Sequence, residues 1–198
     1  AVDTLSADLA EAGDRRRLVR RIEDEGALNI LVNNAGINIR KPIHEFSFEE
    51  YRRVMRTNLD ASFDLCRRLF PLLQAGAPAA VVNNASVAGL THLRTGAPYG
   101  MSKAALIQLT RNLAVEWARW KIRVNAVAPG AIPGGGFQGD FTKLSERIAM
   151  RRPGSPDEVA AGALTLLSER SGAYITGAVL PVDGGLDVHN WIDPPSEI

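Results

Sequence analysis

Short, apolar-rich runs recur along the chain, and they restrict its fold more than any other feature. Residues 28–32 form a nearly unbroken apolar run, which is typical of a strand buried on both faces of a parallel sheet. Small and turn-prone residues follow it at 33–36, where such a strand would end. Further strands of this type are predicted at 79–84, 122–128 and 178–182, and a first one over 1–9 that ends at Asp8.

Helical patterns lie between these predicted strands. They cover residues 14–25, 47–74, 99–117 and 155–167. Ser47 with Glu50, and Ser155 with Glu158, have the spacing of capping boxes at helix starts. Alternating strands and helices predict an α/β fold, in which a doubly wound parallel sheet carries helices on both faces. We expect one domain over 1–198, with a loosely ordered tail at 186–198.

Charge and cysteine content exclude several classes of protein. The 198 residues carry a net charge of +1, which gives no reason to expect nucleic acid as a partner. No apolar run approaches the roughly 18 residues that span a membrane. The arginines of residues 15–21 are bracketed by acidic residues, so we expect a charged helix face there.

Cys66 is the single cysteine, so no internal disulfide can form, and we expect a cytoplasmic protein. The histidines lack metal-ligand spacing, and no metal site is predicted.

Tyr99 and Lys103 carry the chemistry suggested by the residues themselves. On a helix that begins near Tyr99, these two side chains stand at i and i+4 on one face. A phenol has a pKa near 10, and a neighbouring ammonium lowers that pKa toward neutral pH. Ser86 follows a predicted strand, where its hydroxyl could hydrogen-bond a substrate carbonyl. The three residues outline a site for carbonyl reduction or alcohol oxidation.

Asn58 lies in the middle of the helix predicted over 47–74. Asparagine is a poor former of helix interiors, because its amide competes for backbone groups. Two interpretations are open: a tolerated surface residue, or a local distortion that aims a polar group.

Several segments resemble the motifs of the short-chain dehydrogenase/reductase family, in the family's order and over essentially the whole chain. They are Asn33-Asn34-Ala35-Gly36, Asn58, Ser86, Tyr99-x-x-x-Lys103, Arg123-Val124-Asn125-x-Val127-x-Pro129-Gly130 and Thr176-Gly177-x-Val179-x-Pro181-Val182-Asp183-Gly184-Gly185. The run 114–118 is further similar to the tropinone-reductase-like and gluconate-dehydrogenase-like branches. The resemblance implies a Rossmann-like fold and an oxidoreductase that uses NAD or NADP, the preference being open.

The resemblance also implies roles for individual residues. Tyr99 would be the acid/base, Lys103 would assist it and hold the nicotinamide ribose, Ser86 would orient the substrate oxygen, and Asn58 would hold a water. The residues implied to bind the cofactor are Asp8, Leu9, Asn34, Ala35, Gly36, Tyr99, Lys103, Pro129, Gly130 and Ile132.

The sequence departs from the family pattern ahead of Asp8. The family opens with a strand, a Gly-rich phosphate-binding turn, a helix and a second strand, and no such turn precedes Asp8 here. Without those two strands, residues 28–32 would form an exposed sheet edge. Three explanations are open: the natural chain has further residues, the strand at 2–9 pairs directly with 28–32, or another subunit covers the edge. In addition, Gly134 stands where the family has a cofactor-contacting threonine.

Two functions from different classes follow. The first is NAD(P)-dependent interconversion of a secondary alcohol and a ketone, with a small-molecule substrate that the loop at 132–152 would define. The second is a non-catalytic, cofactor-poor family remnant that acts as an oligomeric scaffold, or a fragment of a longer enzyme. A homodimer or homotetramer is expected in either case.

Overall fold

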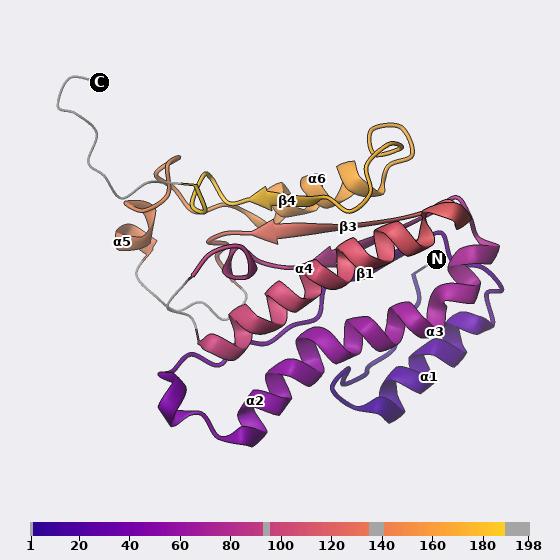
Figure 1. Ribbon diagram of the computed structural model, residues 1–198, viewed down its shortest axis with the longest axis horizontal. Helices are drawn as coiled ribbons and strands as arrows, with labels where there is room; N and C mark the ends of the chain where they lie inside the picture. Colours follow the sequence, from indigo (N-terminus) through magenta and orange to yellow (C-terminus); the bar gives the residue numbers. More distant parts are fainter. Residues whose placement is uncertain (1, 93–95, 135–140, 189–198) are drawn as a thin grey trace.

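The computed structural model describes residues 2–92, 96–134 and 141–188, and its strands form one parallel sheet (Figure 1). The strand order is β1-β2-β3-β4, and every neighbouring pair is parallel. The strands are β1 (Ile30–Asn33), β2 (Ala79–Asn84), β3 (Ile122–Pro129) and β4 (Val179–Val182). The predicted fold class is therefore confirmed.

The connections between the strands are helical. The α-helices are α1 (Ala12–Glu23), α2 (Phe48–Met55), α3 (Ala61–Ala75), α4 (Ala97–Trp117), α5 (Phe141–Ser145) and α6 (Pro156–Leu167). Short 3-10 turns occupy η1 (Ile43–Glu45), η3 (Val87–Gly89) and η4 (Ala118–Trp120), and a π-helical turn, η2 (Arg56–Asp60), joins α2 to α3. Both predicted capping boxes are present, at the starts of α2 and α6.

The sheet is packed on both faces, as its apolar strands predict (Figure 1). Helices α3 and α4 cover one face, and α6 covers the other. Because side chains alternate along a strand, the neighbours Val81 and Val82 of β2 serve different cores. Val81 packs with Trp117 of α4, and Val82 packs with Leu166 of α6. Both valines are fully buried, so β2 is a central strand of the fold.

The outer edge of β1 differs from the rest of the sheet. In the described part of the chain, β1 pairs only with β2. Ile30 and Val32 are 49% and 46% exposed, so the prediction that this strand is buried on both faces is wrong. The prediction that the run would form an exposed edge is confirmed. Val32 points away from α3, and Ile30 shares its face by strand alternation, so the face of β1 that lies away from α3 is left open. The unpaired backbone groups of β1 lie at its outer edge.

Residues 2–9 form no strand, and the strand predicted over 1–9 is wrong for these residues. Direct pairing of this segment with β1 is therefore excluded. Extended backbone needs a partner for its N–H and C=O groups, and here the arginines of α1 provide contacts instead. Arg15 donates to the Leu9 carbonyl at 2.7 Å, and Arg21 forms an ion pair with Asp3 at 2.6 Å.

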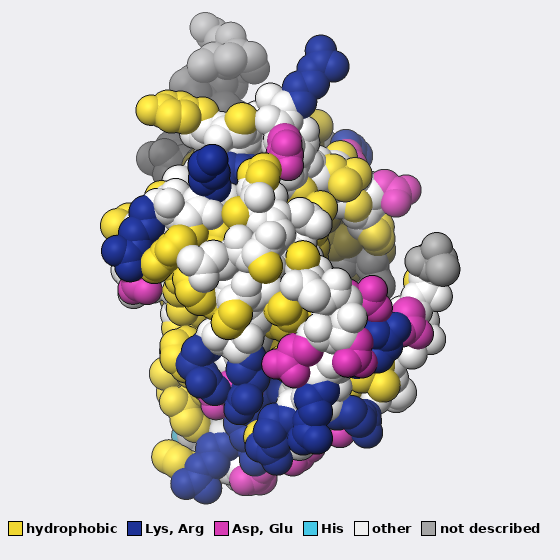
Figure 2. Space-filling model, turned by 90° about the vertical axis from the view of Figure 1, so that its right-hand side faces the viewer, with side chains coloured by type: hydrophobic (Ala, Val, Ile, Leu, Met, Phe, Trp, Pro, Cys, Tyr) yellow, Lys and Arg dark blue, Asp and Glu magenta, His cyan; other side chains and the backbone are white. Residues whose placement is uncertain are grey.

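The arginine cluster is a charged helix face, as expected. Arg15 pairs with Asp64 of α3 at 3.0 Å, and Asp64 also receives Arg67 and Arg68. These contacts hold the pKa of the Asp64 carboxyl at about 2, against the opposing effect of burial. In Figure 2, Lys and Arg side chains gather low on the face shown, with Asp and Glu between them. No described helix combines the length and apolar content that a bilayer crossing requires.

Candidate active site

The carboxyl ends of β1, β2 and β3 lie at one edge of the sheet, because the strands are parallel. Asn34 and Gly130 directly follow the ends of β1 and β3, and Ser86 lies two residues after the end of β2. Helix α4 packs against β3 and η3 and contributes Tyr99 and Lys103, and the π turn η2 packs against α4 and contributes Asn58. The structure thus gathers at one corner the residues that the sequence places far apart.

Lys103 is the most deeply buried charged group of this corner, at 3% exposed. Its Nζ donates to the main-chain oxygen of Asn84 at 2.6 Å and lies 5.8 Å from the centre of the Tyr99 ring. Burial disfavours the charged amine and lowers the pKa of Lys103 to about 8. At neutral pH most Lys103 side chains are therefore still cationic beside Tyr99.

Asn58 sits in the π turn η2 and is fully buried. Its Oδ1 accepts from the N–H of Ile37 at 2.8 Å. Its Nδ2 donates to the carbonyl of Ile37 and to Oγ of Ser102, each at 3.0 Å. A π turn holds one residue more than a regular helical path, and it turns the amide inward. Of the two interpretations of Asn58, the structure supports the local distortion.

Ser102 is a site residue that sequence reasoning missed. It is fully buried, and its Oγ donates to the main-chain oxygen of Tyr99 at 2.7 Å while accepting from Asn58. This hydroxyl therefore connects Asn58 to the first turn of α4. A signal was available in the sequence, because a serine three residues after Tyr99 lies on the same helix face.

Ser86 follows β2 and is 8% exposed. Its Oγ accepts from the N–H of Ala88 at 3.1 Å and caps the short turn η3. That bond uses a lone pair of the oxygen, so the hydroxyl proton can still be donated to a ligand.

Gly36 lies close to two of the buried polar side chains of the corner, those of Asn58 and Lys103. A Cβ atom at this position would be 3.4 Å from Oδ1 of Asn58 and 3.5 Å from Nζ of Lys103. Glycine thus leaves a cradle that any other residue would fill, and backbone there is open to a flat or extended ligand.

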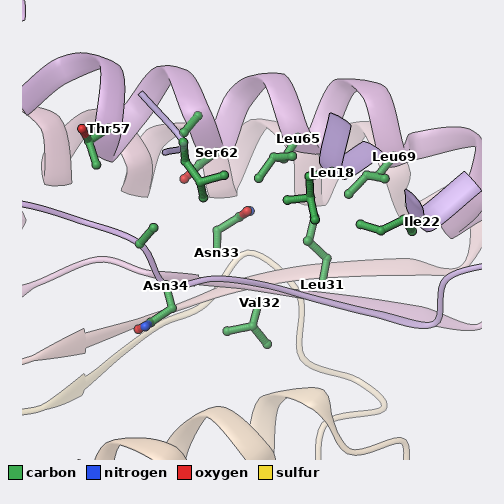
Figure 3. Close-up of a pocket in the computed structure, with 13 residues that line it drawn as sticks. Leu18, Ile22, Leu31, Val32, Asn33, Asn34, Thr57, Ser62, Leu65 and Leu69 are labelled. Carbon is green, nitrogen blue, oxygen red and sulfur yellow. The ribbon is translucent and has the colours of Figure 1, made fainter. Parts of the chain in front are cut away.

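A second hollow, of about 180 Å³, opens beside this corner between β1, α1 and α3 (Figure 3). Leu31 and Asn33 point toward α3, and Val32 and Asn34 point away from it. Three of the residues predicted to bind a cofactor line the hollow, namely Leu9, Asn34 and Ala35. Asp8 is not among the lining residues, and its carboxylate accepts from the N–H of Ala10 instead.

The remaining predicted binding residues follow β3. Gly130 donates its N–H to the Val182 carbonyl at 3.0 Å, and a Cβ there would lie 2.7 Å from Cα of Asp183. Ile132 approaches Gly154, where an added Cβ would be 2.8 Å from Cδ1 of Ile132. Part of the predicted substrate loop, residues 135–140, lies outside the described residues, as does most of the predicted tail.

The chain is similar to known proteins over nearly its whole length. Residues 1–187 match the family described as enoyl-(acyl carrier protein) reductase. A tropinone reductase homologue of Arabidopsis thaliana is 41% identical over 192 residues, which are 93% of this chain and 72% of the relative.

Two solved structures have the same fold. Pseudomonas aeruginosa RhlG, in an active-site complex with NADP, superposes with a TM-score of 0.85 at 36% identity, over 93% of this chain and 76% of that one. A gluconate 5-dehydrogenase from Burkholderia cenocepacia, in complex with NADP and tartrate, gives a TM-score of 0.83 at 33% identity, over 90% and 72% of the two chains.

Proposed function

Because this chain belongs to the short-chain dehydrogenase/reductase family, we propose that it interconverts a secondary alcohol and a ketone with NAD or NADP. The observation that carries the proposal is the placement of Lys103. A buried lysine that stays cationic at neutral pH, 5.8 Å from the Tyr99 ring, stabilises negative charge on a phenolate. A phenol supported in this way can exchange a proton with a substrate oxygen.

The residues at the strand ends fit a dinucleotide. The cofactor supplies the hydride, and the protein supplies position and electrostatics. Leu9, Asn34 and Ala35, which line the hollow of Figure 3, would hold its adenosine half. Asp8 does not line the hollow, and it would contact the adenine only from its place next to Leu9 in the chain. Gly36 would let the backbone approach it, and the set Tyr99, Lys103, Pro129, Gly130 and Ile132 would enclose the nicotinamide half.

Proton transfer would run through the buried corner. Ser86 donates its hydroxyl proton to the substrate oxygen and orients it, and Tyr99 protonates the nascent alkoxide during reduction. Asn58 would hold a water that returns a proton to Tyr99. In the direction of oxidation the same groups act in reverse.

The test is the variant Tyr99→Phe, with Tyr174→Phe as its control, because Tyr174 is fully exposed. Turnover is measured as absorbance change of NADH and NADPH with a panel of linear and cyclic ketones. We expect Y99F to lose about 10²- to 10⁴-fold in kcat, the contribution of a general acid, with an unchanged melting temperature. Turnover by Y99F equal to wild type would refute the assignment. A folded wild type without turnover on any ketone or alcohol would favour the non-catalytic alternative.

A further inference from the structure

The amide of Asn84 has no part in the mechanism above, although it lies at the centre of the site. Asn84 is the last residue of β2, and side chains alternate along a strand. Asn83 points toward α4, where its Nδ2 donates to Thr110 at 2.9 Å. Asn84 therefore points to the same side of the sheet as Val82, which packs against α6.

Asn84 joins the two halves of the proposed cofactor site. Its main-chain oxygen accepts from Nζ of Lys103 at 2.6 Å. Its Nδ2 donates to Oδ1 of Asn34 at 2.6 Å. Lys103 belongs to the proposed nicotinamide half and Asn34 to the proposed adenosine half. Asn84 is thus in direct contact with residues of both.

The oxygen of this amide has no hydrogen-bond partner among the described residues. Oδ1 of Asn84 is buried, and no donor within the described residues reaches it. A buried carbonyl oxygen that loses its hydrogen bonds to water without replacement destabilises the fold by about 1–3 kcal/mol. Such groups are rare in folded proteins, and each one calls for an explanation, such as a catalytic role or a group that the protein itself does not supply.

We propose that Oδ1 of Asn84 accepts a hydrogen bond from a hydroxyl of the nicotinamide ribose. This inference rests on the proposed function. A dinucleotide offers two kinds of donor near Lys103, namely ribose hydroxyls and the nicotinamide carboxamide. The ribose is favoured, because the lysine that would hold its hydroxyls is itself held by the main chain of Asn84.

The experiment compares wild type with Asn84→Leu, which has a similar size and no polar atoms. The control is Asn112→Leu, because Asn112 is exposed on α4 and bonds only locally to Gln108 in the described structure. Dissociation constants are measured calorimetrically for three probes. NADH carries the whole nicotinamide nucleoside, ADP-ribose keeps the second ribose without the base, and ADP lacks both.

We expect N84L to bind NADH and ADP-ribose about five- to tenfold more weakly than wild type, the effect of one neutral hydrogen bond. Its affinity for ADP should stay within about twofold, and N112L should match wild type for every probe. If N84L fails to fold, as judged by its melting curve, Asn84→Ala removes the same amide without adding bulk.

Three outcomes would overturn the inference while wild type still binds the dinucleotide. Equal weakening for all three probes would mean that the amide only positions Asn34. Weakening for NADH alone would assign the donor to the nicotinamide base, and no weakening would mean that Oδ1 contacts no ligand. A wild type that binds none of the probes would instead overturn the proposed function, and this inference with it.

Discussion

The proposed catalytic corner and the outer strand β1 depart from the usual distribution of polar and apolar residues in opposite ways. At the corner, Asn58 and Lys103 are polar side chains at 0% and 3% exposure. At the edge, Ile30 and Val32 are apolar side chains that are about half exposed. The corner is held by short hydrogen bonds inside the protein, whereas residues 2–9 are held by contacts from α1, the part-buried Arg15 and the exposed Arg21. These buried polar side chains stand at the proposed site of chemistry, and these exposed apolar side chains form a surface available for contact.

Replacing Lys103 by Met is expected to have the largest effect on turnover among the changes to the corner that follow. We expect turnover to fall by about 10²- to 10³-fold, since the positive charge next to Tyr99 is lost. Stability should change in the opposite direction. Lowering the pKa of Lys103 from 10.5 to about 8 means that burying the charged amine destabilises the folded state by about 3 kcal/mol at neutral pH. Loss of the bond to Asn84 offsets part of this, so K103M should gain about 1–3 kcal/mol.

The pH dependence tests this assignment. The folded-state pKa of Lys103 lies below its unfolded value. The destabilisation that the buried charged amine causes is therefore complete below pH 8, and it declines as pH rises from 8 toward 10.5. The stability gap between K103M and wild type, measured by urea unfolding, should therefore narrow over this window. Lys143→Met, on the short helix α5, is the control and should show no such gap. A K103M variant that is less stable than wild type at pH 7 would contradict the prediction.

Replacing Gly36 by Ala would change the corner more gently. The new Cβ would make ordinary contacts with Asn58 and Lys103, so we expect the melting temperature to change little. It would also fill the cradle, and NADH should bind about tenfold more weakly in a fluorescence titration, a loss of about 1.4 kcal/mol. Gly13→Ala on α1, where an added Cβ meets only Arg16, is the matched control. Unchanged affinity of G36A would place the cofactor elsewhere.

The smallest effect is expected at the edge. Val32→Thr and Val82→Thr make the same change in adjacent strands, at positions that are register partners. At the half-exposed Val32 the free energy of unfolding should change by no more than about 0.5 kcal/mol. At the fully buried Val82 the new hydroxyl should destabilise by about 1–3 kcal/mol. Equal effects in urea unfolding would show that the edge is covered in solution.

Much of the fold could be predicted from the sequence, because β2 and β3 are apolar and both capping boxes have unambiguous spacing. The strand predicted over 1–9 failed because strand formation depends on a neighbour, and a local pattern contains no information about one. The burial of 28–32 failed for the same reason. At the proposed catalytic corner, Tyr99 and Lys103 were predicted from helix spacing. Ser102 and Asn84 were not, because their roles depend on contacts between distant segments.

The π turn at Arg56–Asp60 has a consequence for insertions and deletions. Such a turn contains one residue more than a regular helix, and each residue of an α-helix rotates the chain by about 100°. Deleting a single residue between Met55 and Ala61 would therefore join α2 and α3 into one continuous helix. Asn58 would then swing away from Ile37 and Ser102 with its side chain unaltered. The amide of Asn58 therefore lies in the protein interior because of the helical register that the π turn sets, and not only because residue 58 is an asparagine.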